Sequence, residues 1–233
     1  MAITPVKRGL FIVFEGIDGS GTSTQANLLH EYLSRTNELS TQLTFEPTKG
    51  KVGTMIRQSL FEANPYQHAS DGRGIDVSDR LFNDQLMHLI MADRHEHVFN
   101  TTDGIQQYLN AGITVICIRY MASTIAYQTN GSVTDIAKVV AAHREFPDPD
   151  MVIYLNNPVE CSLDRLSTRS NLDCFERKEK LISVRANYER YFQTYCCSEH
   201  YCVNAAQPIL SVHESVLAGL KAAKYIDDEG QIR

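Results

Sequence analysis

Residues 16–23 have the types and spacing of a loop that holds phosphate groups. The segment Gly-Ile-Asp-Gly-Ser-Gly-Thr-Ser fits the pattern G-x-x-x-x-G-K-[ST] at each fixed position except that of the lysine, which is Thr22. Glycines let the backbone turn its N–H groups inward, and the N-terminus of a following helix adds positive potential. The alternative is a glycine-rich turn without a ligand. The pattern favours binding of nucleotide phosphates by a loop that comprises Gly16, Ile17, Asp18, Gly19, Ser20, Gly21, Thr22, Ser23 and Thr24.

Two side chains of this loop affect metal binding and the rate of phosphoryl transfer. Ser23 occupies the position whose hydroxyl ligates a Mg²⁺ ion shared with the nucleotide phosphates. Thr22 offers no charge where a lysine ordinarily neutralises the transferring phosphoryl group. Losing a comparable electrostatic contact costs about 3–4 kcal/mol of transition-state stabilisation, or about 10²–10³-fold in rate. The sequence therefore predicts a magnesium and nucleotide site whose catalytic centre is weakened.

The elements that must position this loop follow from the hydrophobic pattern. Residues 9–14 form a continuous apolar run, typical of a parallel strand covered on both faces, and residues 22–35 have apolar side chains at helical spacing. The remaining strands are predicted at 42–45, 114–118, 151–155 and 201–204, and the remaining helices at 78–110 with a break near 100–104, 159–169, 178–195 and 210–223. Strands that alternate with helices predict a three-layer α/β P-loop NTPase fold with a five-stranded parallel sheet. Ligands bind such a sheet beyond the carboxyl ends of its strands.

Composition narrows the class of protein. The chain has 233 residues, 43% of them hydrophobic, which fits a single domain spanning 1–233. A net charge of −6 argues against a nucleic-acid partner, and no apolar run approaches the ~20 residues that span a bilayer. The N-terminus is too short and polar for a signal peptide, so we expect a cytoplasmic protein.

Six cysteines lie in no CxxC pair, and reduced thiols are expected for a protein of this location. Four potential metal ligands fall within seven residues: Cys196, Cys197, His200 and Cys202. Adjacent cysteines are not a zinc-knuckle spacing, so ordinary half-buried side chains are the favoured interpretation over a metal site.

Several blocks in order make the sequence resemble the thymidylate kinase family over about residues 9–221. The first block is Phe-Glu-Gly-Ile-Asp-Gly-Ser-Gly at 14–21, followed by Ser-Thr-Gln at 23–25. The others are Ala-Asp-Arg at 92–94, Arg-Tyr-Met-Ala-Ser-Thr-Ile-Ala-Tyr-Gln at 119–128, Pro-Asp-Pro-Asp at 147–150 and Val-Arg-Ala-Asn-Tyr at 184–188. The phosphate loop is common to many NTPases, whereas the block at 119–128 is specific.

This resemblance implies ATP-dependent phosphorylation of thymidylate or a related deoxynucleoside monophosphate, with ATP and Mg²⁺ as cofactors and a homodimer formed through helices that include residues 81–98. The planar guanidinium group suits a phosphate, so the family implies catalytic roles for Arg119 and for the lid residues Arg165 and Arg169, in a lid at about 165–177. The acceptor nucleotide would contact Asp18, Phe45, Arg57, Arg94, Arg119, Ser123, Thr124, Tyr127 and Gln128, and the metal would contact Ser23 and Asp18.

Four positions depart from the family pattern. Thr22 replaces the lysine of the phosphate loop, and Ile118 replaces the aspartate of Asp-Arg-Tyr. Ile90 replaces the phenylalanine that stacks on thymine, and Cys174 replaces an arginine of the lid. These departures leave two alternatives open: a catalytically weakened or inactive nucleotide-binding homologue, or a kinase with altered acceptor specificity. Phe45 would then offer the aromatic wall that Ile90 does not.

Overall fold

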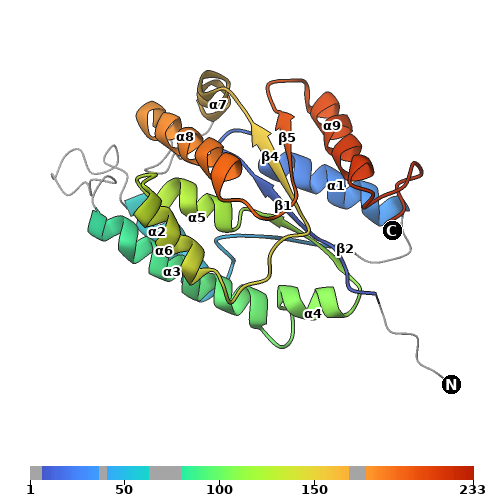
Figure 1. The fold of residues 1–233 in the computed structure, drawn as a ribbon, viewed down its shortest axis with the longest axis horizontal. Coiled ribbons are helices and arrows are strands. Elements are labelled where there is room, and N and C mark those ends of the chain that lie inside the picture. Colours follow the sequence, from blue (N-terminus) through green and yellow to red (C-terminus); the bar gives the residue numbers. More distant parts are fainter. Residues whose placement is uncertain (1–6, 37–40, 63–79, 168–176) are drawn as a thin grey trace.

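The computed structural model describes residues 7–36, 41–62, 80–167 and 177–233. Its centre is a parallel five-stranded sheet with the strand order β2-β3-β1-β4-β5 (Figure 1). The strands are β1 (Phe11–Glu15), β2 (Thr41–Phe45), β3 (Thr114–Ile118), β4 (Met151–Asn156) and β5 (His200–Asn204). The predicted α/β class and parallel five-stranded sheet are confirmed.

Helices lie on both faces of this sheet (Figure 1). They are α1 (Thr22–Thr36), α2 (Lys51–Glu62), α3 (Arg80–Phe99), α4 (Ile105–Asn110), α5 (Met121–Gln128), α6 (Val133–Ala142), α7 (Val159–Leu166), α8 (Lys178–Thr194) and α9 (Ile209–Ala222). The predicted break near 100–104 separates α3 from α4. It is held by Asn100, whose side-chain oxygen accepts a hydrogen bond from the backbone N–H of Thr102 at 2.8 Å. The helices α2, α5 and α6 were not predicted from the sequence.

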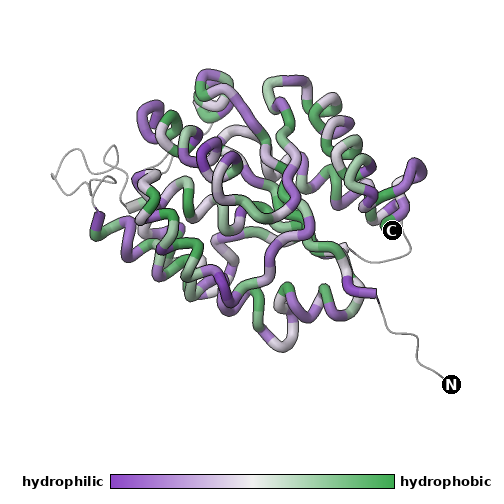
Figure 2. The backbone as a smooth tube through the Cα atoms, viewed as in Figure 1, coloured by the Kyte–Doolittle hydropathy of each residue, from purple (hydrophilic) through white to green (hydrophobic). Residues whose placement is uncertain are grey.

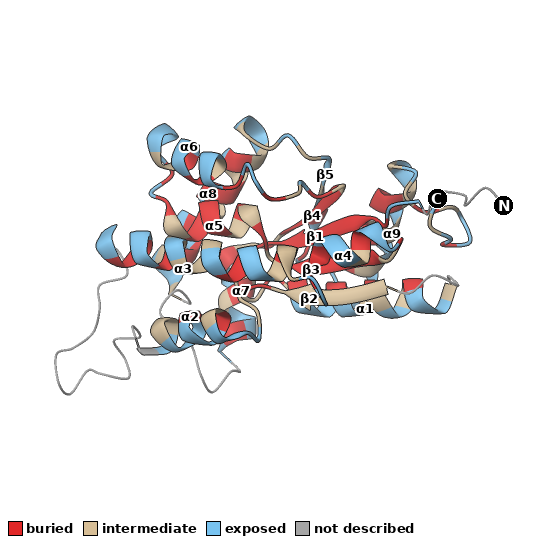
Figure 3. Ribbon diagram, turned by 90° about the horizontal axis from the view of Figure 1, so that it is seen from below, coloured by how far each residue is buried: buried red, intermediate tan, exposed pale blue. Residues whose placement is uncertain are grey.

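The two faces of the sheet bury alternate residues of the same strand. Ile12 and Phe14 of β1 pack in the cluster that includes residues of α1 and α9, whereas Phe11 and Val13 pack in a cluster with residues of α4. All five residues of β1 and all five of β3 are buried. Burial on both faces explains why these strands read as continuous apolar runs. Figure 3 shows the buried residues concentrated in the sheet and on the inward faces of the helices.

The loops that form the candidate functional site leave the carboxyl edge of the sheet. β1 leads into residues 16–21 and then into α1, and β3 leads through Arg119 and Tyr120 into α5. The most hydrophobic residues lie at the centre of the molecule, and hydrophobic and hydrophilic residues alternate along the surrounding helices (Figure 2). Among the described residues, no helix has the length and apolar character needed to cross a membrane.

Candidate functional site

The loop at residues 16–21 has the backbone that its glycines were expected to allow. Gly19 and Gly21 have positive φ angles of 76° and 97°, and a Cβ atom on Gly19 would lie 2.7 Å from the carbonyl oxygen of Ser162. The side-chain oxygen of Ser20 is buried and has no hydrogen-bond partner within the part of the chain that the structure describes. A tight turn before a helix N-terminus, with a buried donor to spare, fits the oxygens of a phosphate chain.

The helix α1 begins at the position where the phosphate-loop lysine would stand. Thr22 is its first residue and is buried, with 8% of its surface exposed, whereas Ser23 and Thr24 are exposed in the first turn. That turn contains no acidic side chain, so the positive end of the helix is not neutralised locally. These residues therefore combine a free helix terminus with hydroxyl groups, but they contribute no cation.

Arg165 of α7 contacts the outer side of this loop. Its Nη1 group donates to the carbonyl oxygen of Gly19 at 3.1 Å, and its Nη2 group donates to that of Ala205 at 2.9 Å. The arginine therefore links the loop at 16–21 to the segment that follows β5. Arg169, the other predicted lid arginine, lies outside the described residues, as does most of the predicted lid at 165–177.

A cavity of about 150 Å³ opens between the phosphate loop and the helices α2, α3 and α5. One wall is aliphatic and comprises Ile56, Leu60, Leu86 and Ile90. Seven predicted site residues line the same cavity: Asp18, Arg94, Arg119, Ser123, Thr124, Tyr127 and Gln128. Residues from four separate segments of the chain thus meet in one place, with an apolar wall facing a polar one.

Arg119 stands between this cavity and the phosphate loop. It has a left-handed backbone with φ of 67°, which is unusual for a residue other than glycine. Its guanidinium group donates to Asp18 at 2.5 Å and to the carbonyl oxygen of Gly16 at 3.1 Å, and it lies over the ring of Tyr127. Burial alone would lower the pKa of Arg119, but Tyr127 and Asp18 raise it well above its ordinary value. The side chain is therefore a fixed cation.

Both carboxylate oxygens of Asp18 accept hydrogen bonds from protein donors. Its Oδ1 atom accepts from Arg119, and its Oδ2 atom accepts from the Tyr127 hydroxyl at 2.7 Å. The same hydroxyl accepts from the backbone N–H of Asp18 at 3.1 Å. These contacts join Asp18 to Arg119 and Tyr127 at the polar lining of the cavity.

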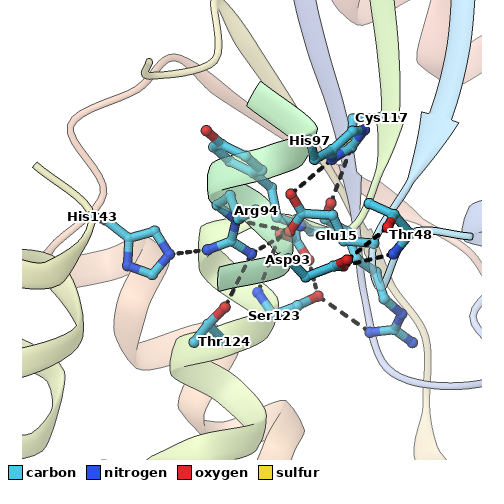
Figure 4. Close-up of polar contacts among 12 residues, drawn as sticks. Glu15, Thr48, Asp93, Arg94, His97, Cys117, Ser123, Thr124 and His143 are labelled. Carbon is cyan, nitrogen blue, oxygen red and sulfur yellow. Dashed lines mark hydrogen bonds and ion pairs between the residues drawn. The ribbon is translucent and has the colours of Figure 1, made fainter. Parts of the chain in front are cut away.

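Glu15 holds the segment that carries Arg119. It accepts hydrogen bonds from the backbone N–H groups of Tyr120 at 2.8 Å and Ser123 at 3.2 Å, at the start of α5. It also accepts from the hydroxyl groups of Ser123 at 2.5 Å and Tyr188 at 2.9 Å. Only 1% of Glu15 is exposed, and this burial raises the pKa of its carboxyl group. Figure 4 shows Glu15 beside Ser123 and Arg94.

Arg94 of α3 lies in a second polar group, shown in Figure 4. Its Nε donates to Glu46 at 2.8 Å, and its Nη2 group forms an ion pair with the same carboxylate. Nη2 also donates to Thr124 at 3.2 Å, and Nη1 donates to the Nε2 atom of His143. Burial alone would raise the pKa of Glu46, but Arg94 and then His97 outweigh it and bring that pKa below its ordinary value. Glu46 is thus the counter-charge of a buried arginine.

The loop after β2 is fixed from two sides. Asp93 accepts from the backbone N–H of Thr48 at 2.7 Å and from its hydroxyl group at 2.6 Å. Arg57 donates to the carbonyl oxygens of Pro47 at 2.7 Å and Thr48 at 2.6 Å. Arg57 therefore holds this loop and is not among the residues that line the cavity, although the sequence had suggested contact with the acceptor.

Phe45 lies on the other face of the sheet. It pairs with Ile118 in the register of β2 with β3, and both side chains pack in the cluster that includes residues of α1. The sequence had offered Phe45 as an aromatic wall for the base, but the cavity wall that includes Ile90 is aliphatic.

No group of three or more metal-ligating side chains occurs in the described ranges, and burial raises the pKa of both Cys196 and Cys202. The expectation of half-buried side chains holds for Cys196 alone, because Cys197, His200 and Cys202 are exposed.

Sequence reasoning overlooked four side chains that organise this site: Glu15, Glu46, His143 and Tyr188. A signal existed for the two glutamates, because Glu15 is the last residue of β1 and Glu46 directly follows β2 at the carboxyl edge of the sheet. Tyr188 ends the block at 184–188 that resembles the family, whereas no pattern in the sequence relates His143 to the site.

Comparison with known proteins identifies the family. The family model for thymidylate kinase matches residues 14–216. The chain belongs to the thymidylate kinase family. It is 36% identical over 187 residues to the thymidylate kinase of Akkermansia muciniphila, which covers 80% of this chain and 81% of that protein. It is 35% identical over 215 residues to the "probable thymidylate kinase" of Pyrococcus horikoshii, covering 92% of this chain and 97% of that protein.

A third relative extends this agreement to another bacterium. The chain is 32% identical over 216 residues to the thymidylate kinase of Desulfotalea psychrophila, with 91% of this chain and 95% of that protein covered. The family predicted from the sequence is therefore confirmed, and its members are nucleoside-monophosphate kinases. The departures Thr22 and Ile118 stand within the matched residues, one at the start of α1 and the other at the end of β3.

Proposed function

We propose that this protein transfers the terminal phosphoryl group of ATP to thymidylate. The observation that carries the proposal is the cavity in which Arg94, Arg119, Asp18 and Tyr127 meet beside the phosphate loop. Arg119 is bonded both to the loop at Gly16 and to Asp18 of the acceptor side, so it stands where the two nucleotides would meet. Membership of the thymidylate kinase family supports thymidylate as the acceptor.

The acceptor nucleotide is proposed to lie with its phosphate toward Arg94 and Arg119 and its base toward the aliphatic wall. Guanidinium groups match the geometry of phosphate oxygens, and the buried site strengthens their attraction. Ser123, Thr124 and Gln128 supply polar contacts along α5. A wall that contains Ile90 in place of an aromatic ring gives the base shape-dependent contact without stacking, so acceptors related to thymidylate are expected to compete.

The donor nucleotide is proposed to bind residues 16–24. Their positive-φ glycines, the start of α1 and the Ser20 hydroxyl, which has no hydrogen-bond partner among the described residues, fit a polyphosphate. Ser23 and Asp18 are suited to hold Mg²⁺, because the Ser23 side chain is exposed in the first turn of α1 and each carboxylate oxygen of Asp18 can accept a second partner besides Arg119 or Tyr127. When bound, the metal ion neutralises charge that develops on the phosphate oxygens. Arg119 and Arg165 both contact the phosphate loop, at Gly16 and at Gly19, so both are candidate catalytic cations among the described residues.

The experiment that tests this function measures turnover and binding together. A coupled assay for ADP is run with thymidylate and a panel of other monophosphates, and calorimetry measures the affinity of each nucleotide. We expect thymidylate to be phosphorylated, and Arg94→Ala or Arg119→Ala to weaken its binding by about ten- to a hundredfold while ATP binding stays near wild type, since a hydrogen bond to a charged group contributes about 1.5–3 kcal/mol. Unaltered thymidylate affinity in both variants would refute the assignment.

Assembly and location complete the proposal: a cytoplasmic homodimer. Residues of α3 support the dimer, because Leu81 is 63% exposed and Met87 and Leu89 are only partly buried. The sequence supports the cytoplasmic location, because it has no apolar run of the length that spans a bilayer and its N-terminus does not resemble a signal peptide. Light scattering at micromolar concentration is expected to give twice the chain mass of 26.3 kDa, and a mass equal to one chain would refute the dimer.

A further inference from the structure

Tyr188 is a buried tyrosine of α8 whose hydroxyl group belongs to the polar network behind Arg119. The helices α8 and α5 lie side by side (Figure 1), and their apolar residues pack in one cluster that leaves none of Tyr188 exposed. The hydroxyl oxygen lies 2.9 Å from a carboxylate oxygen of Glu15 and 2.8 Å from the hydroxyl oxygen of Ser123. Tyr188 is not among the residues that line the cavity, so its effect on a bound nucleotide is transmitted through these two partners.

The hydrogens of this network have a defined order. Burial first, and then Glu15, raise the pKa of Tyr188 well above its ordinary value, so the hydroxyl group keeps its hydrogen and can donate it. Ser123 donates to Glu15 at 2.5 Å. Arg119 has N–H donors and no acceptor, and its Nη1 group lies 3.3 Å from the Ser123 oxygen. The Ser123 hydroxyl group therefore turns its hydrogen away from Arg119 and offers it a lone pair.

The contacts around Tyr188 fix its position relative to α5. Asn187, the preceding residue, donates to the carbonyl oxygens of Ala126 at 3.1 Å and Thr129 at 3.2 Å. Both carbonyl groups lie at the end of α5, where the helix has no N–H groups left for them. The ring of Tyr188 lies 5.4 Å from that of Tyr154 in β4, measured between centroids. The hydroxyl group is thus carried by a side chain that both a helix and the sheet hold in place.

We propose that Tyr188 is a positioning residue whose hydroxyl group fixes that of Ser123, which in turn holds the guanidinium group of Arg119 between the cavity and the phosphate loop. The inference rests on the proposed function, in which Arg119 stands where the two nucleotides meet. Arg119 also donates to Asp18 and to the carbonyl oxygen of Gly16, and both of these belong to the phosphate loop. Ser123 adds a contact that ties the same guanidinium group to α5, and Tyr188 ties this contact to α8.

The test compares Tyr188→Phe with Tyr191→Phe. Each variant removes one buried hydroxyl group from α8 and keeps the ring, but the hydroxyl group of Tyr191 meets the thiol of Cys196 and not Glu15. We expect Tyr188→Phe to lower kcat/KM for thymidylate about tenfold, near the lower end for one hydrogen bond to a charged group, and to leave the affinity for ATP in calorimetry unchanged. Tyr191→Phe should change neither value. A purely structural role of Tyr188 would affect urea unfolding in both variants and the kinetics in neither.

A second comparison tests the connection through Ser123. Ser123→Ala should lower kcat/KM for thymidylate at least as much as Tyr188→Phe does. In the Ser123→Ala background, Tyr188→Phe should add little, because two residues that act through one contact are not additive. Ser123→Ala also provides the test by itself if Tyr188→Phe does not unfold cooperatively in urea.

Equal kinetic effects of the two tyrosine variants would overturn the inference. Wild-type kinetics in Ser123→Ala, or an undiminished effect of Tyr188→Phe in that background, would overturn it as well. If Arg119→Ala slows turnover and Tyr188→Phe does not, this inference alone falls. If Arg119→Ala leaves turnover unchanged, the proposed role of Arg119 falls.

Discussion

Replacing Glu15 by alanine tests how the site is built. Glu15 accepts two backbone N–H groups, those of Tyr120 and Ser123, and two hydroxyl groups, those of Ser123 and Tyr188. Alanine leaves the two N–H groups at the start of α5 without a partner. A buried donor left unsatisfied costs about 1–3 kcal/mol, so the two together predict a loss of about 2–6 kcal/mol in the free energy of unfolding. The hydroxyl groups can turn to each other and add little.

Urea unfolding followed by circular dichroism measures this loss, with Glu15→Gln as the matched control. The glutamine keeps one oxygen for the two N–H groups, and its amide can donate to the hydroxyl oxygens of Ser123 and Tyr188. We expect Glu15→Gln to fall within about 1.5 kcal/mol of wild type, the typical net value of one hydrogen bond. An alanine variant as stable as the glutamine variant would refute the reasoning. Its turnover should fall as well, because the start of α5 holds Arg119 in its left-handed backbone.

The same pair of proteins gives a pH test. Burial raises the pKa of Glu15 above its ordinary value of 4.5, so the folded protein keeps this proton at a pH where the unfolded chain has lost it. Ionisation of Glu15 therefore lowers the stability of the wild type as pH rises from 4.5 through the raised pKa. Glu15→Gln lacks this effect, so its stability relative to wild type should increase over that window. A difference that does not change with pH would contradict the raised pKa.

Three further changes have definite expected outcomes. Glu46→Gln leaves the buried Arg94 without its counter-charge and should destabilise the protein by about 3–5 kcal/mol in urea unfolding, where a loss below about 1 kcal/mol would show that the pair is not needed. Thr22→Lys should raise kcat about tenfold or more, equal to about 1.4 kcal/mol of barrier for each tenfold. Unchanged or lower turnover, with or without Ile118→Asp, would show that Thr22 is not simply a loss. Arg165→Ala should weaken ATP binding in calorimetry and leave thymidylate binding unchanged, and the reverse pattern would contradict its place on the phosphate loop.

Much of the fold could be predicted because a strand that is buried on both faces has a continuous apolar sequence. β1 and β3 are buried on both faces and are apolar throughout, so their limits are visible in the sequence. α5 was missed for the opposite reason. It has only eight residues, too few to show a helical period, and its start is fixed by Glu15 from a different strand rather than by a capping residue of its own. Tertiary contacts therefore define this helix.

The same distinction between local pattern and tertiary contact decides which residues of the site could be predicted from the sequence. Arg119 directly follows β3, and Asp18 lies in the loop that leaves β1, so the topology places both at the carboxyl edge of the sheet, and both line the cavity. Phe45 also ends a strand, but its register beside Ile118 turns it to the other face of the sheet, which the sequence does not show. His143 approaches Arg94 from 49 positions along the chain, and no local pattern indicates that contact.

The most direct test of the account is the fate of the terminal phosphoryl group of ATP. ATP labelled with oxygen-18 in that group is incubated with thymidylate, Mg²⁺ and the wild-type protein, and the products are separated and analysed by mass spectrometry. The account predicts that the label appears in thymidine diphosphate and that Arg119→Ala, which removes the cation between the two nucleotide sites, slows its appearance at least about a hundredfold. Label found in inorganic phosphate alone, or thymidine diphosphate formed equally fast by Arg119→Ala, would contradict it.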